Sequence, residues 1–78
     1  YRRTTMAYEQ VSIEVENEDV EEWKAQIDRM ALNREVEDIW ELDDYKTVIE
    51  FETKDKGFLL ETLERISDKF LLYYTVDE

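Results

Sequence analysis

The stretch that decides the fold of this chain is residues 35–53, which read EVEDIWELDDYKTVIEFET. It contains two runs of strand-forming residues, 35–42 and 45–53, separated by Asp43 and Asp44. Runs rich in β-branched and aromatic residues are typical of strands, and a two-residue separation between two such runs is typical of a β-hairpin. We therefore predict a β-hairpin whose loop is this pair of aspartates.

A two-residue loop fixes the register of the hairpin, because it places Leu42 opposite Tyr45 and every other pair follows from that one. The pairs that this register turns toward the core are Trp40 with Thr47 and Val36 with Phe51. The pairs that it turns to the opposite face are Glu41 with Lys46, Ile39 with Val48, and Glu37 with Glu50. Asp38 does not fit this pattern, since it falls opposite Ile49 on the apolar face.

The segment before the hairpin predicts a strand followed by a helix. In residues 8–16, Val11, Ile13 and Val15 alternate with polar residues, which is the two-residue period of a half-buried strand. Apolar side chains then recur at helical spacing up to Asn33, and acidic residues near the start of this segment suit the positive end of a helix dipole.

The segment after the hairpin predicts a second helix and a closing strand. Residues 54–69 place Leu59, Leu63 and Ile66 on one helical stripe. Residues 70–76 contain no charged side chain and are rich in aromatic and aliphatic residues, which favours a strand. The predicted order of elements is therefore strand, helix, strand, strand, helix, strand.

This order resembles that of the ferredoxin-like fold, an α+β sandwich in which two helices cover one face of a four-stranded antiparallel sheet with the strand order 4-1-3-2. Many unrelated functions share this architecture, so the resemblance implies a fold and no activity. A chain of this length supports one core. We expect residues 7–78 to form a single domain and residues 1–6 to be a flexible tail.

The composition argues against an enzyme. The chain has 78 residues with no His, no Cys and a single Gly. It lacks the imidazole and thiol groups that most nucleophilic and acid–base sites use, and the glycine-rich loops that cradle phosphates. Its carboxylates do not follow the spacing of a calcium-binding loop. We therefore expect a non-enzymatic protein without a cofactor or a bound metal.

The net charge determines which partners the chain attracts. Asp and Glu number 22 against 10 Lys and Arg, which gives a formal net charge of -12. Such a chain repels nucleic-acid phosphates and anionic lipids, and none of its apolar runs approaches the roughly 20 residues that span a bilayer. We expect no direct binding to nucleic acid or membrane, and a basic protein surface as the partner. The absence of cysteine favours a cytoplasmic location.

The sheet face without helices is the predicted binding site. Sheets of this topology often bind RNA on that face through aromatic and basic residues, but the outward positions here are mostly acidic. We interpret the face as an apolar centre rimmed by carboxylates, which is typical of a protein interface. The predicted binding residues are Glu14, Glu16, Glu37, Ile39, Glu41, Val48, Glu50, Glu52 and Tyr73.

The corresponding function is that of a small binder that occupies a basic groove of another protein, for example one that normally holds nucleic acid. The chain is similar in size and charge, and in nothing else, to bacteriophage inhibitors that imitate the charge of DNA. The alternative is a structural or assembly subunit that forms a homodimer through the edge strand at residues 70–76. An edge strand without charge is open to pairing with another strand.

Overall fold

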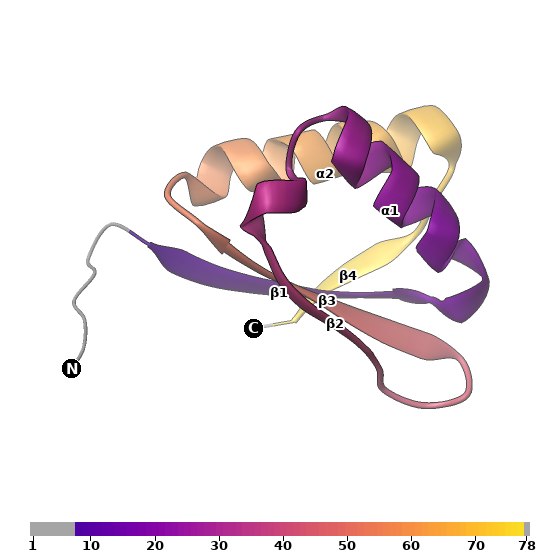
Figure 1. Cartoon of the computed structure of the whole chain (residues 1–78). Helices are drawn as coiled ribbons and strands as arrows, with labels where there is room; N and C mark the ends of the chain where they lie inside the picture. The colour runs from indigo at the N-terminus through magenta and orange to yellow at the C-terminus, as the bar shows by residue number, and fades with distance from the viewer. Residues whose placement is uncertain (1–7, 78) are drawn as a thin grey trace, which may run out of the picture.

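The computed structural model describes residues 8–77 of the 78-residue chain, so the predicted tail at residues 1–6 lies outside the described residues. The chain alternates strands and helices in the predicted order (Figure 1). The elements are β1 (Glu9–Glu16), η1 (Asn17–Asp19), α1 (Val20–Arg29), η2 (Asn33–Glu35), β2 (Val36–Glu41), β3 (Lys46–Thr53), α2 (Lys56–Phe70) and β4 (Tyr74–Asp77). The elements η1 and η2 are single 3₁₀ turns on either side of α1.

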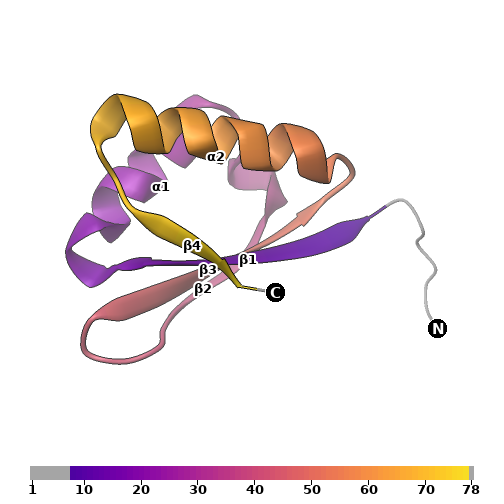
Figure 2. The same cartoon turned by 180° about the vertical axis from the view of Figure 1, so that it is seen from behind.

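The four strands form one antiparallel sheet in the order β2-β3-β1-β4, which is the predicted order 4-1-3-2 counted from the other edge. Both helices lie on the same face of this sheet (Figures 1 and 2). The Cα radius of gyration is 12.4 Å, close to the roughly 11.5 Å of a compact domain of this length. The described residues therefore form a small α+β domain with two layers.

The core lies between the sheet and the two helices. The alternation in β1 turns Val11, Ile13 and Val15 toward the helices, and all three are buried. Their neighbours in β3 on that face include Phe51 and Ile49, which are fully buried. The helices add a buried stripe to this cluster, made of Trp23, Ile27, Leu59, Leu63 and Ile66.

The predicted register of the hairpin is wrong for most of its length. Val36 pairs with Phe51 as predicted, but a β-bulge at Glu37 shifts the remaining pairs by one residue. The observed pairs are Asp38 with Glu50, Ile39 with Ile49, Trp40 with Val48, and Glu41 with Thr47. Because side chains alternate along a strand, this shift turns Ile39 toward the core and Trp40 away from it.

The loop of the hairpin explains the shift. Leu42 donates its backbone N–H to the carbonyl of Lys46 over 2.8 Å, so the loop contains three residues instead of the predicted two. The Asp43 carboxylate accepts the backbone N–H groups of Tyr45 and Lys46 over 2.8 and 2.9 Å. An aspartate that bonds its own following backbone in this way stabilises a turn.

The last strand also begins later than predicted. Helix α2 starts after Asp55, whose carboxylate accepts the N–H of Phe58 over 3.0 Å, and the helix continues to Phe70. Leu71 then takes a left-handed conformation with φ 55° and ends the helix. Residues 70–73 therefore belong to the helix end and its turn, and the edge strand contains only Tyr74–Asp77.

Candidate protein-binding face

The face of the sheet opposite the helices, which we call the open face, is covered by no element among residues 8–77 (Figures 1 and 2). Its side chains alternate with the buried ones of the same strands. On the two central strands they are Gln10, Ser12, Glu14 and Glu16 of β1, and Lys46, Val48, Glu50 and Glu52 of β3.

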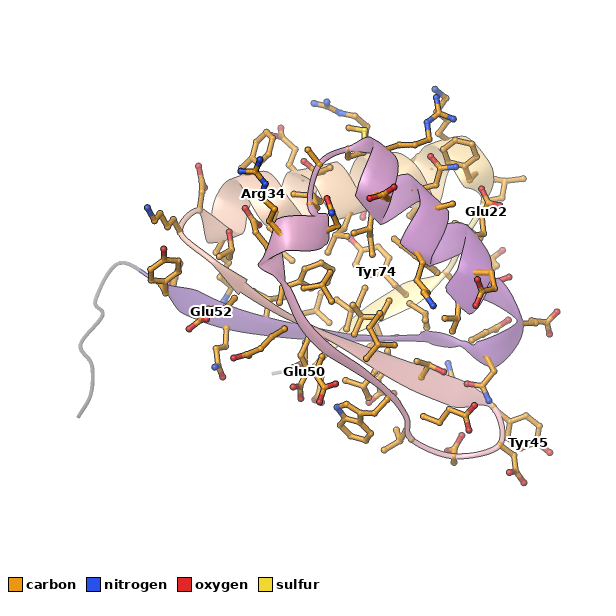
Figure 3. All side chains as sticks on the ribbon, viewed as in Figure 1. Glu22, Arg34, Tyr45, Glu50, Glu52 and Tyr74 are labelled. Atoms are coloured by element: carbon orange, nitrogen blue, oxygen red, sulfur yellow. The ribbon has the colours of Figure 1, made fainter. Side chains whose placement is uncertain are left out.

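One part of the open face holds carboxylates that the sheet register brings together. Asp38 of β2 lies directly opposite Glu50 of β3, and Glu52 follows two residues later on the same face. Figure 3 shows Glu50 projecting from the side of the sheet opposite the helices. Glu37 reaches this group through the bulge, since its carboxylate accepts the side-chain N–H of Gln10 over 3.4 Å.

Asp77 of β4 completes the group on the far side, where it pairs with Ser12. We call these residues the acidic half of the open face: Glu37, Asp38, Glu50, Glu52 and Asp77. Like charges directly opposite each other across a strand pair are destabilising by a few tenths of a kcal/mol to about 1 kcal/mol. The Asp38 and Glu50 pair therefore offers the fold no benefit that would explain its presence.

The other part of the open face lies next to the hairpin loop and holds apolar side chains, with Glu14 and Glu16 of β1 beside them. Trp40 lies opposite Val48 and keeps 41% of its surface exposed. Val48 is only 3% exposed, although it belongs to the open face and not to the core cluster. The side chains around it on the open face must therefore cover it. We call Trp40, Leu42, Tyr45 and Val48 the hairpin patch; Leu42 and Tyr45 are also exposed.

Within residues 8–77, no ion pair neutralises the carboxylates of the open face. Lys46 is the one basic residue on the central strands of this face. Among the described residues the one salt bridge joins Lys24 to Glu21 over 3.7 Å, and it lies on α1. The acidic half therefore carries a negative charge that no described basic residue pairs with, and such a charge attracts cations and basic surfaces.

The loop beside the hairpin patch is held by a charged hydrogen-bond acceptor. The backbone N–H groups of Tyr45 and Lys46 lower the pKa of the Asp43 carboxyl below its usual value. The Asn17 side chain joins the loop to the end of β1, since its N–H donates to the Asp43 carbonyl over 3.2 Å and its oxygen accepts the Thr47 hydroxyl. These bonds fix the position of the hairpin patch relative to β1.

The structure places six of the nine predicted binding residues on the open face. They are Glu14, Glu16, Val48, Glu50 and Glu52 on the central strands, and Glu37 at the bulge. Tyr73 precedes β4 and is 74% exposed.

The predicted position on the open face was wrong for Ile39 and Glu41, because the register shift turns both toward the helical side. Ile39 packs against the core, and Glu41 lies opposite Thr47. Trp40 and Asp38 take their places on the open face, and neither was among the predicted binding residues. The signal that could have found them was the misfit of Asp38 opposite Ile49 in the predicted register.

Metal-binding clusters and membrane-spanning helices are both absent from the described residues. Within residues 8–77, no group of three or more His, Cys, Asp or Glu side chains is arranged to hold a metal ion. In the same part of the chain, no helix has the length and apolar character needed to cross a bilayer.

Comparison with known proteins adds no relative: no family model matches the chain, and no curated protein or solved structure is significantly similar to it. The assignment of a function therefore rests on the geometry and charge of the open face.

Proposed function

We propose that this chain is a small non-enzymatic binding protein that docks its open face onto a basic surface of a partner protein. The observation that carries the proposal is the juxtaposition, on one uncovered sheet face, of the hairpin patch with carboxylates that no ion pair within residues 8–77 neutralises. The partner surface with matching chemistry is a basic groove, such as one that otherwise holds the phosphates of nucleic acid. The protein would act by occupying that groove.

The hairpin patch would supply the affinity. Tryptophan and tyrosine are enriched among the few residues that dominate binding energy at interfaces. Trp40 lies opposite Val48 in the sheet and is still 41% exposed, so a partner can bury the exposed part of its side chain without unfolding the sheet.

The acidic half would supply the rate of encounter and the choice of partner. Complementary charge raises association rate constants toward about 10⁸ M⁻¹s⁻¹ at low salt and disfavours acidic competitors. The carboxylates of Asp38, Glu50 and Glu52 lie beside the hairpin patch, so a basic surface guided by them would meet Trp40.

The same proposal includes a ferredoxin-like fold. The order of elements and the strand order of the sheet support it, and such folds commonly bind their partners on the uncovered face.

The test is to capture partners from a cell extract on the immobilised protein and on two variants of equal net charge. The double variant Glu50→Lys/Glu52→Lys reverses the acidic half. The control Glu61→Lys/Asp68→Lys makes the same change at exposed positions of α2, on the other side of the sheet. At 0.1 M salt, where the Debye length is about 10 Å, we expect the control to retain the basic proteins that the wild type retains and the face variant to lose them. Equal retention by both variants would refute the proposal.

The alternative function, self-assembly through the C-terminal edge, has one observation in its favour. Strand β4 lies at an edge of the sheet, and residues 70–76 contain no charge. The strand itself is only four residues long, which weakens it as a template for pairing. Sedimentation equilibrium tests this candidate: an assembly subunit shows a mass that rises with concentration, and Tyr73→Lys at the start of the edge abolishes that rise.

A further inference from the structure

The second edge of the sheet, strand β2, borders a groove. The groove lies between β2 and α1 and encloses about 510 Å³. Its apolar lining comes from Ala25 and Ile27 of α1 and from Val36 and Ile39 of β2. Figure 1 shows α1 and β2 together on the near side of the molecule, whereas α2 and β4 are together on the near side in Figure 2.

A second groove continues the first along β2. It encloses about 250 Å³ and shares Glu21 and Ile39 with its neighbour. Its other lining residues include Val20 of α1 and Glu41 at the end of β2. The two grooves together therefore follow β2 from Val36 to Glu41, with α1 as the opposite wall.

The backbone of β2 is open toward this groove at Ile39. The Ile39 N–H donates to the Asp38 carboxylate over 2.9 Å, so it points away from β3. In an antiparallel strand the N–H and C=O of one residue point to the same side, and the next residue but one repeats the pattern. The backbone groups of Ile39 and Glu41 thus lie along the free edge of β2.

A strand from another chain that paired with the free edge of β2 would contact two different surfaces. Its side chains directed to the helical side would enter the first groove, which is mainly apolar beside Ile27, Val36 and Ile39. Its side chains directed to the open face would lie beside Trp40 and Asp38, at the border of the acidic half. The groove beside Ile27, Val36 and Ile39 is mainly apolar, and the open face at this edge is acidic. Because side chains alternate along a strand, an occupant that suits both surfaces has apolar and basic residues in alternation.

We propose that the free edge of β2 pairs with an extended segment of the partner protein in which apolar and basic residues alternate. The inference rests on the proposed function, because the basic character of the partner comes from there. Asp38 selects the occupant: its carboxylate covers the Ile39 N–H until a basic strand takes that position. The edge also disfavours a second copy of this chain, since β2 carries Glu37, Asp38 and Glu41 and would face its own charges.

The experiment uses the intact protein and synthetic peptides. The first peptide alternates valine and lysine, and its control has the same composition with the lysines in one block. Backbone amide NMR signals of the ¹⁵N-labelled protein report binding. We expect the alternating peptide to bind at least about tenfold more tightly than the block peptide, with changes centred on Val36–Glu41 and slower hydrogen exchange at Ile39 and Glu41. Equal affinity of the two peptides would overturn the inference.

A pair of variants tests the backbone contact itself. Asp38→Asn and Asp38→Ala remove the same charge, but only alanine frees the Ile39 N–H completely. We expect Asp38→Ala to bind the alternating peptide several-fold more tightly than Asp38→Asn. Identical affinities would show that the Ile39 N–H takes no part in binding.

A third variant tests the groove. Ala25 is exposed on α1, and Ala25→Arg would fill the groove without disturbing the core. We expect this change to weaken the alternating peptide at least about tenfold, whereas Glu18→Gln, which changes the net charge equally, should not. If Ala25→Arg leaves the affinity for the alternating peptide unchanged while Glu50→Lys/Glu52→Lys still abolishes retention of the extract proteins, the strand-pairing inference fails and the proposed function stands. If Glu50→Lys/Glu52→Lys retains the same extract proteins as the wild type, the proposed function itself fails.

Discussion

Strand β3 passes between two environments, and its two faces show what determines burial in this protein. Toward the helices, Ile49 and Phe51 are fully buried in the core. Toward solvent, Glu50 is only half-buried, yet Val48 is as inaccessible as a core residue. The helices bury the first face, whereas on the open face Val48 is buried between its two cross-strand neighbours, Trp40 and Glu14.

The comparison separates stability from binding. Side chains on the helical face contribute to folding because two layers pack on them. Side chains on the open face contribute little to folding, apart from Val48, and are free to contact a partner. Substitutions of matched kind on the two faces should therefore have different consequences, and the following experiments are ordered by the size of the effect.

The largest effect is expected for Leu63→Ala. Leu63 is fully buried on α2 between the helices and the sheet. Its truncation leaves a cavity and should lower the free energy of unfolding by about 2 to 5 kcal/mol, measured by urea denaturation. The exposed Glu61 on the same helix provides the control, since Glu61→Ala should change that free energy by less than about 0.5 kcal/mol. An unaltered midpoint for Leu63→Ala would contradict the described core.

The register of the hairpin predicts the next effect. Ile39→Asp places a charge against the core and should lower the free energy of unfolding by roughly 2 kcal/mol or more. Trp40→Asp makes the same change one residue later, on the open face, and should cost distinctly less. The register that follows from a two-residue loop would bury Trp40 and expose Ile39. If Trp40→Asp lowered the free energy of unfolding more than Ile39→Asp, that register would be correct and the observed one would be contradicted.

Tyr74, the first residue of β4, predicts how the stability of the protein changes at alkaline pH. Burial, together with the hydrogen bond to Glu64 over 2.8 Å, raises the pKa of Tyr74 to about 12. The raised pKa means that the unfolded state loses this proton first, so stability should fall as the pH rises from about 10 to about 12. Tyr74→Phe should remove this fall in pH-dependent unfolding curves, and Tyr73→Phe is the matched change at the exposed neighbour. The same alkaline fall in Tyr74→Phe as in the wild type would contradict the assignment.

The smallest effect is a gain. Glu50→Gln removes the repulsion between Asp38 and Glu50 and should raise the free energy of unfolding by about 0.2 to 1 kcal/mol at low salt. The gain should shrink at 1 M salt, where the Debye length is about 3 Å. Glu18→Gln, far from this pair, serves as the control. A loss of stability in Glu50→Gln would show that the two carboxylates do not face each other.

Part of the fold and of the open face could be predicted from the sequence alone. The order of elements was predictable because the apolar residues of β1 repeat every second position, β3 is rich in β-branched and aromatic residues, and the apolar residues of α2 follow one helical stripe. The acidic character of the open face was predictable for the same reason, since Glu14, Glu50 and Glu52 alternate with buried residues.

The register of β2 was not predictable from the loop alone. The Asp43 side chain bonds two backbone N–H groups and thereby adds Tyr45 to the loop, and the bulge at Glu37 then restores the pairing of Val36. The resulting register places Ile39 opposite Ile49, which is a tertiary contact that the loop sequence does not specify. The late start of β4 had no signal either, because Leu71 takes a left-handed conformation that usually favours Gly or Asn.

The most direct test of the open face as a binding surface is to measure the association and dissociation rate constants of the captured partner with two variants. At 0.1 M salt, Glu50→Lys/Glu52→Lys should lower the association rate constant at least about tenfold. Trp40→Ala should instead raise the dissociation rate constant at least about tenfold while the association rate constant stays within about threefold. Wild-type rate constants for both variants would contradict the account, because neither the charge nor the aromatic ring of the open face would then contact the partner.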